Sequence, residues 1–324
     1  MSTSDYKTDA LTAKEKLAEV SPTMCLAKWN QTSLHLPTGL TNSCYHPPLH
    51  KIDADAVKLN PAALHNTQDK LNQRQQMLEG EQPEGCSYCW NMEKTGEMSD
   101  RHYRSGEPWA MQDFEDIRKN PIDEHWTPRY VEVNFNNACN LKCSYCSPQF
   151  STTWGKEIDR YGQYPTSPPH NAPEHFQGRR RPIPNREENP YVTAFWRWWP
   201  TLYKNLKHFR MTGGEPMMDK NTYKVFQYII DHPKRDLHLN VTSNMCPADK
   251  KLKQKYYNMA QNICMEEKVE HMMQFVSVDA FGPRAEYIRN GLDFNHMMDN
   301  VEEFLDRIPV RNSITFICTY NNLS

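Results

Sequence analysis

The sequence predicts an α/β protein, with repeated strand and helix units in its C-terminal part and a smaller cysteine-rich region before them. Three observations support this prediction. From about residue 130 onward, short strand-like runs follow one another, and segments with helical periodicity separate several of them. Seven of the ten cysteines lie before residue 150. The length of 324 residues is typical of about two domains.

The N-terminal segment is polar. Residues 1–24 carry no sustained period, so we expect a flexible tail with one short helix over residues 11–20. Two short alternating runs follow within residues 32–45, on either side of Pro37, Thr38 and Gly39, and they predict a hairpin with a longer loop. Cys25 then precedes the first strand, and Cys44 ends the second.

A helix is expected directly after the hairpin. Asn66 is a suitable N-cap and Gly80 a suitable stop for a helix over the polar run between them. Cys86 and Cys89 follow at once in a CxxC pair. We therefore predict that residues 25–110 form one small cysteine-rich domain.

The second predicted domain covers residues 111–324. Its five expected strands cover residues 131–135, 206–211, 237–242, 275–278 and 314–320. Helical periodicity is clear over residues 223–230 and 297–308. Repeated βα units favour a parallel sheet or barrel with its active site at the C-terminal ends of the strands. The first connection, residues 146–205, contains a long proline-rich, charged insertion.

Composition narrows the class of protein. Lys and Arg (38) nearly balance Asp and Glu (40), so a nucleic-acid partner is not expected. No run is long and apolar enough for a membrane span, and the start lacks the apolar core of a secretory signal. We expect a cytoplasmic protein that does not bind a membrane, in which clustered cysteines are metal ligands or catalytic thiols.

The chemistry-bearing motif follows the first strand of the βα series. Cys139, Cys143 and Cys146 have the spacing CxxxCxxC. Three thiolates on one tight loop can hold three irons of a 4Fe-4S cluster, which usually takes four cysteines. The fourth iron would be open, as in catalytic metal sites. A zinc site and incidental thiols are the alternatives, but zinc favours pairs of cysteines joined by a longer spacer.

This motif resembles the signature of the radical S-adenosylmethionine (radical SAM) superfamily, since the aromatic Tyr145 precedes its last cysteine. A second motif agrees, because Gly213-Gly214-Glu215-Pro216 ends the next strand and is similar to the GGE motif of that superfamily. Glycine allows close backbone approach to a ligand, and a carboxylate can accept hydrogen bonds from an ammonium group. GGE alone would predict a turn with a solvated glutamate, but the pair of motifs at successive strand ends disfavours that alternative.

Polar residues also stand at the later strand ends. They are similar to superfamily positions that hold the carboxylate and ribose of S-adenosylmethionine, and Ser277 and Arg289 are our preferred carboxylate partners. Each could equally be a strand-end group that bonds only to backbone. The set comprises Ser243, Asn244, Ser277, Asp279, Arg284 and Arg289.

The resemblance implies an enzyme. S-adenosylmethionine would chelate the open iron, with Glu215 orienting its amine. One electron passing through the 4Fe-4S cluster would cleave the cofactor to methionine and a 5'-deoxyadenosyl radical, which abstracts hydrogen from a substrate. An electron donor is implied, either a reductase or a flavodoxin or ferredoxin. Whether the net reaction is an oxidoreduction or a transfer is left open.

The resemblance also implies a six-stranded partial (β/α)6-type barrel. Only five strands can be counted, so the last one would be an exposed edge, which natural proteins normally protect. We therefore expect the natural gene product to continue beyond Ser324 by a strand and one or more helices.

A second cysteine set lies upstream and comprises Cys25, Cys44, Cys86 and Cys89. The segment resembles the auxiliary-cluster domain called twitch, a short relative of the SPASM domain, although that domain often follows the barrel. An auxiliary 4Fe-4S cluster is our first interpretation. A structural zinc site and ordinary reduced cysteines are the alternatives.

The substrate is expected to be a peptide that the enzyme modifies during maturation. A small metabolite, such as a nucleoside, a sugar or a cofactor precursor, is an alternative. A protein of another class, a non-catalytic electron-transfer or zinc-scaffold protein, is favoured only if the GGE match is accidental.

Overall fold

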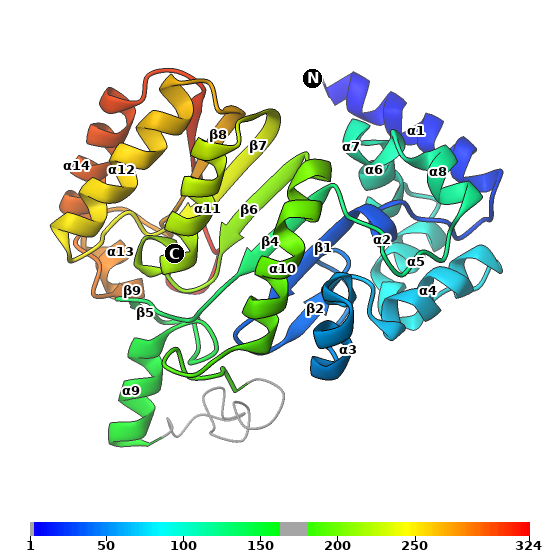
Figure 1. Ribbon diagram of the computed structural model, residues 1–324. Helices are drawn as coiled ribbons and strands as arrows, with labels where there is room; N and C mark the ends of the chain where they lie inside the picture. Colours follow the sequence, from blue (N-terminus) through cyan, green and yellow to red (C-terminus); the bar gives the residue numbers. More distant parts are fainter. Residues whose placement is uncertain (1–2, 163–180) are drawn as a thin grey trace. The chain divides into compact units, whose positions relative to one another are not determined.

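The computed structural model describes residues 3–162 and 181–324, so part of the proline-rich insertion lies outside the described residues (Figure 1). The chain divides into two compact units. Unit 1 comprises Met1–Leu34, Gly39–Val131 and Pro190–Lys207. Unit 2 comprises His35–Thr38, Glu132–Asn189 and His208–Ser324. The predicted cysteine-rich segment lies in unit 1, apart from residues 35–38.

Unit 2 is built on a parallel sheet with the strand order β10-β8-β7-β6-β4 (Figure 1). The pairs β6/β7, β7/β8 and β8/β10 are parallel, with Phe209 opposite Leu239 and Leu239 opposite Met272. The predicted five strands and the parallel sheet are therefore confirmed. The strands are β4 (Tyr130–Asn134), β6 (His208–Thr212), β7 (Lys234–Ser243), β8 (Val269–Ser277) and β10 (Asn312–Ile317).

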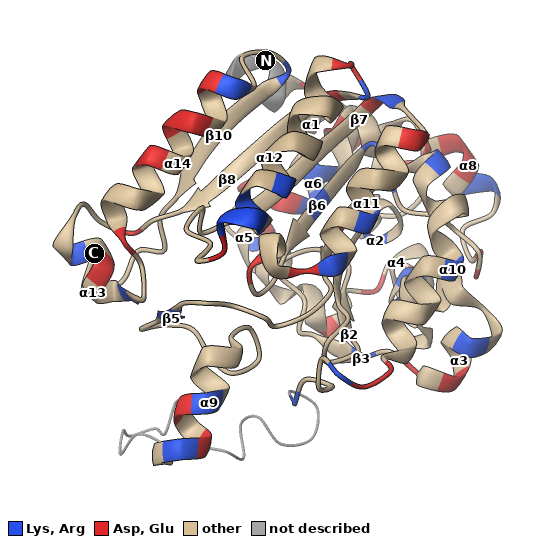
Figure 2. Cartoon of the chain, turned by 60° about the vertical axis from the view of Figure 1, so that its left-hand side comes forward, with Lys and Arg blue, Asp and Glu red and all other residues tan. Residues whose placement is uncertain are grey.

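Three amphipathic helices connect these strands and bury their apolar faces. They are α11 (Lys220–Asp231), α12 (Lys250–Met265) and α14 (Phe294–Arg307). Phe226, Tyr256 and Phe304 form an aromatic cluster, and the Tyr256 hydroxyl donates to Gln274 on β8 at 2.6 Å. Figure 2 shows acidic residues along α14. The buried residues of this helix are mainly apolar and include Met297, Val301 and Phe304.

The sheet alternates between a buried and a partly exposed face. Phe209 and Met211 on β6 are buried, whereas Arg210 between them is partly exposed and lies over the Phe275 ring at 4.5 Å. A parallel sheet covered on both sides would have nearly continuous apolar strands. The polar alternation therefore marks one face of the sheet as less buried than the helix-covered face.

The remaining elements of unit 2 lie in its connections. No described helix in either unit is both long and apolar enough to cross a membrane. The connecting elements are β5 (Lys142–Cys143), α9 (Thr152–Tyr161), the 3-10 helix η5 (Pro216–Met218), α13 (Pro283–Ile288) and β9 (Arg289–Asn290).

Unit 1 is mainly helical around three neighbouring strands in the order β1-β2-β3, of which β2 and β3 are antiparallel. Its strands are β1 (Gln31–His35), β2 (Leu40–Asn42) and β3 (His50–Lys51). Its helices are α1 (Thr3–Ala18), α2 (Ala27–Asn30), α3 (Ala54–Leu59), η1 (Pro61–Leu64), α4 (Gln68–Leu78), η2 (Glu84–Cys86), α5 (Ser87–Lys94), α6 (Asp100–Gly106), α7 (Pro108–Met111), α8 (Phe114–Lys119) and α10 (Pro190–Asn205).

Two helices of unit 1 differ from the sequence-based expectation. Helix α1 covers most of the segment expected to be a tail, and its Ala10, Ala13 and Leu17 are buried. The N-cap of α4 is Thr67, whose hydroxyl accepts from the Lys70 backbone N–H at 3.2 Å. The predicted N-cap, Asn66, was wrong by one position, because its amide is engaged with the backbone carbonyls of residues 124 and 126.

We predict that Phe304→Ala lowers the free energy of unfolding by about 3 to 5 kcal/mol, because it removes a buried ring from the aromatic cluster. Its neighbour Leu305 lies on the same helix and is exposed. The matched control Leu305→Ala should change stability by about 0.5 kcal/mol or less. Urea unfolding of both variants measures the difference, and equal losses would contradict the packing described for α14.

Candidate functional site

The residues singled out in unit 2 lie at the C-terminal ends of its strands. The cysteine loop follows β4, and the GGE motif follows β6. Ser243 is the last residue of β7, and Ser277 is the last residue of β8 and partly exposed. Because the strands are parallel, these ends lie on one edge of the sheet, which is where α/β folds place their functional groups.

The GGE motif packs directly on the chain that leads into the cysteine loop. Glu215 N–H donates to the carbonyl of Ala138 at 2.6 Å, and Gly214 N–H donates to that of Asn136 at 3.3 Å. A Cβ on Gly214 would overlap the Ala138 carbonyl oxygen. The absence of a side chain therefore allows the two motifs to meet immediately before Cys139.

Gly213 is constrained in a different way. Its φ of 119° lies in a region that side-chain-bearing residues rarely adopt. A Cβ here would also overlap the Asn134 side chain at the end of β4. Both glycines of the motif thus have a steric role in this loop.

Glu215 is held in one orientation and is only 1 % exposed. Its Oε1 accepts from the Ser243 hydroxyl at 2.7 Å and from Met217 N–H at 3.0 Å, and its Oε2 accepts from Asn244 N–H at 2.8 Å. Burial raises the pKa of this carboxyl despite these bonds. Each carboxylate oxygen can accept about two hydrogen bonds, so Oε2 retains one acceptor position.

The three thiols of the loop influence one another. Burial, and then the charge of Glu215, raises the pKa of Cys139 to about 12, with smaller contributions from the other two thiols. Burial, and then Cys143, raises the pKa of Cys146 to about 11. Burial raises the pKa of Cys143, while Arg289 opposes the increase. Burial thus favours the neutral thiol form of all three cysteines.

Cys143 is fixed by a two-residue ladder. It lies on β5 opposite Arg289 on β9, and the Arg289 guanidinium donates to its Sγ at 3.6 Å. Trp154 Nε1 donates to the Cys143 carbonyl at 2.9 Å, and Cys146 N–H donates to the same carbonyl at 3.0 Å. This positions the middle of the motif from both sides.

Arg289 also joins a buried ionic network. It forms an ion pair with Asp279 at 2.8 Å, and Asp279 accepts from the Tyr145 hydroxyl at 2.8 Å. The guanidinium lies 5.5 Å from the centre of the Tyr145 ring. The structure therefore brings into contact three residues that the sequence motifs predicted separately, Arg289, Asp279 and Tyr145.

The sequence did not reveal two residues that hydrogen-bond to the candidate site residues at the C-terminal ends of the strands. Asn140, inside the CxxxCxxC motif, donates to the Cys246 carbonyl at 2.8 Å and accepts from the Asn244 amide at 2.9 Å. Thr319, just after β10, donates its N–H to Asp279 at 2.9 Å. The position of Asn140 between two cysteines was the only available signal, and nothing in the sequence distinguished Thr319.

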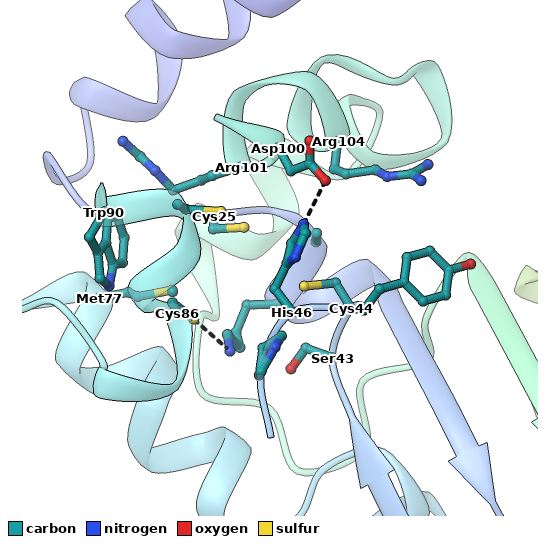
Figure 3. Close-up of a pocket in the computed structure, with 15 residues that line it drawn as sticks. Cys25, Ser43, Cys44, His46, Met77, Cys86, Trp90, Asp100, Arg101 and Arg104 are labelled. Atoms are coloured by element: carbon teal, nitrogen blue, oxygen red, sulfur yellow. Dashed lines mark hydrogen bonds and ion pairs between the residues drawn. The ribbon is translucent and has the colours of Figure 1, made fainter. Parts of the chain in front are cut away.

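The four upstream cysteines line one pocket within unit 1 (Figure 3). Cys25 precedes α2, Cys44 follows β2, Cys86 ends η2, and Cys89 lies on α5. Burial raises the pKa of Cys25 to about 12, and the other three thiols add to the increase. The wide sequence spacing therefore does not prevent the four residues from meeting.

Charged and aromatic groups line the same pocket. Lys28 Nζ donates to Cys86 Sγ at 3.3 Å, a bond drawn as a dashed line in Figure 3. His46 pairs with Asp100 at 2.7 Å and stacks on Tyr88 with ring centroids 3.8 Å apart. Within residues 3–162 and 181–324, no three His, Cys, Asp or Glu side chains are arranged around a single metal-ion position.

Comparisons with known proteins find few similarities. No protein-family model and no curated protein matches the chain. SuiB from Streptococcus suis bound to precursor peptide SuiA is 12 % identical, with a TM-score of 0.38, over 85 % of this chain and 52 % of that chain. SuiB from Streptococcus suis is 13 % identical, with a TM-score of 0.36, over 94 % and 56 %. This chain thus spans about half the length of each, and functional assignment rests on its own residues.

We predict that Gly214→Ala lowers the free energy of unfolding by about 2 to 3 kcal/mol, because the new methyl group must displace the backbone before Cys139. Gly155 in α9 is the matched control, since nothing lies within 4 Å of a Cβ added there. Gly155→Ala should leave stability unchanged or raise it by about 1 kcal/mol. Thermal unfolding compares them, and an unaffected Gly214→Ala variant would refute the close approach.

Proposed function

We propose that this chain is a radical SAM enzyme with its active site at the C-terminal end of a partial (β/α)6-type barrel. Cys139, Cys143 and Cys146 would hold a 4Fe-4S cluster there. The observation that carries the proposal is the backbone contact between Glu215 and Ala138, because it joins the two motifs. A chance GGE tripeptide has no reason to pack against the residue that precedes the first cysteine.

The residues present fit such a cluster. Three buried or half-buried thiols share one short loop, and each thiolate of a cubane binds a different iron, so they need not converge on one point. When bound, the cluster and S-adenosylmethionine supply the reductive cleavage that yields a 5'-deoxyadenosyl radical. A low-potential reductase, flavodoxin or ferredoxin would be the electron donor.

The protein's part is to bind and orient the cofactor. Glu215 has one acceptor position left on Oε2, which suits the amine of S-adenosylmethionine. Arg289 donates hydrogen bonds to Asp279 and Cys143 through two of its five N–H groups, and its buried Nε has no hydrogen-bond partner, so N–H groups are left for a carboxylate. Ser277 lies at the adjacent strand end.

The other assigned residues complete the proposed cofactor site. Asn244 and Asp279 are assigned to the ribose and neighbouring polar groups. Gly213 and Gly214 keep the loop free of side chains. Tyr145, bonded to Asp279, closes the site beside the cluster loop.

For unit 1 we propose an auxiliary 4Fe-4S cluster in a twitch- or SPASM-like domain. The pocket that contains Cys25, Cys44, Cys86 and Cys89 supports it. A structural zinc ion is the alternative that experiment must separate; it would require the four thiols to move toward one point, since no three of them surround a single metal-ion position in the described residues. In enzymes with such domains the auxiliary cluster is thought to orient substrate or to pass electrons.

We further propose that the substrate is a peptide and that the enzyme works in the cytoplasm. The auxiliary-cluster domain supports a peptide through the group of enzymes that it resembles. A small metabolite is the second candidate, and a product analysis with candidate peptides would separate the two.

We predict that the protein, reconstituted without oxygen with iron and sulfide, binds about eight iron atoms per chain. Given a reductant, it should form 5'-deoxyadenosine from S-adenosylmethionine. Cys143→Ala should reduce the iron to about four atoms per chain and abolish 5'-deoxyadenosine, because one ligand of the open cluster is lost. Iron binding without cofactor cleavage in the unmodified protein would indicate an electron-transfer protein instead.

The upstream set gives a separate prediction. The double variant Cys86→Ser/Cys89→Ser should lose about four iron atoms per chain yet still cleave S-adenosylmethionine in the absence of substrate, because the first cluster is intact. Metal analysis and the 5'-deoxyadenosine assay measure the two effects. Unchanged iron would exclude the auxiliary cluster, and zinc in place of iron would favour a structural site.

A further inference from the structure

Unit 1 buries three cations together. Lys28 is 2 % exposed, and Lys70 and Arg74 are 0 % exposed. In the part of the chain that the structure describes, none of them has a carboxylate ion-pair partner. Their side chains instead donate to neutral groups. Lys28 donates to Gln73 and to the Cys86 thiol. Lys70 donates to the hydroxyls of Thr32 and Thr41, and Arg74 donates to Asn66, His65 and the carbonyl of Lys28.

Such an arrangement is costly unless negative charge lies nearby. A buried, unpaired cation is destabilising, and close cations add repulsion. Lys28 lines the four-cysteine pocket, and its ammonium lies between Cys86 Sγ at 3.3 Å and Gln73 Oε1 at 2.6 Å. Four thiolates around a metal group would supply the missing negative charge.

The other buried cation at the pocket is already compensated. Arg101 pairs with Glu93 at 2.6 Å, and its guanidinium also donates to the Met24 carbonyl. Its positive charge is therefore largely neutralised within unit 1. Arg104 also lines the pocket but is only half-buried. Lys28 is therefore the buried lining cation, among the described residues, that has no acid beside it.

We propose that Lys28 is a positioning residue that donates to the Cys86 thiolate and tunes the reduction potential of the group held in this pocket. The inference rests on the auxiliary cluster proposed above. One electron from a low-potential donor makes a thiolate-ligated cluster more negative by one charge. A fixed ammonium and its hydrogen bond stabilise that reduced form, so Lys28 raises the potential.

The test uses the full chain with Cys139, Cys143 and Cys146 changed to Ala, so that only the upstream cluster gives a signal. Lys28→Met removes the charge at similar length, and Lys28→Arg retains it. The matched control is Lys58→Met, because Lys58 is exposed and pairs with Asp55 on α3 of the same unit. Each variant is reconstituted with iron and sulfide, analysed for iron, and titrated with dithionite while the paramagnetic resonance of the cluster is recorded.

We expect Lys28→Met to lower the equilibrium constant for reduction about tenfold, a shift of about 59 mV to more negative potential. Lys28→Arg and Lys58→Met should stay near the unmodified potential. Loss of iron from Lys28→Met alone would also support the proposal, since the charge would then be needed to hold the cluster at all.

Two results would overturn the role of Lys28. One is an unchanged potential and iron content in Lys28→Met. The other is an equal change in Lys28→Met and Lys28→Arg, because charge would then not be the cause. Failure of the auxiliary-cluster proposal gives a different result. The triple-alanine protein with Lys28 unchanged would then bind zinc or no metal at the upstream cysteines.

Discussion

The backbone hydrogen bond from Glu215 to the carbonyl of Ala138 is the contact on which the candidate active site depends. It joins the turn after β6 to the chain that enters the cysteine loop after β4. It also sets the direction of the Glu215 carboxylate, which then accepts from Ser243 and Asn244 at the end of β7. Three neighbouring strand ends are thereby held together by main-chain groups and one buried acid, so the site is shaped before any cofactor binds.

The fold was predictable where the chain alternates regularly. The five strands of unit 2 stand out because each places apolar residues on one face, as Phe209 and Met211 do on β6. Helix α9 is amphipathic but was not found in advance, because it lies in the connection that we interpreted from the sequence as a proline-rich, charged insertion. The exact start of α4 could not be predicted either, because Asn66 and Thr67 are both suitable N-caps. Hydrogen bonds from the Asn66 side chain to a distant part of the chain leave Thr67 to cap the helix.

The candidate site was predictable from its motifs, but its supporting contacts were not. Spacing identified the cysteines, and the adjoining glycines identified Glu215. Bonds such as Asn140 to Asn244 join residues from different strand ends, so only the folded chain brings them together.

The two cysteine sets share one pattern, in which a buried cation donates to a thiol. They differ in charge, because Arg289 is paired with Asp279 and Lys28 has no such acid among the described residues.

The main-chain nature of the Glu215 to Ala138 contact has a consequence for sequence variation. The carbonyl oxygens of Asn136 and Ala138 are present whatever side chains these positions carry, whereas Gly213 and Gly214 have no room for any. A library of variants should therefore be permissive at Ala138, as far as local packing allows, and strict at the two glycines. The steric requirement at this junction therefore lies in the turn after β6, whereas the Asn136 side chain supports the opposite segment by accepting from Ala138 N–H at 2.8 Å.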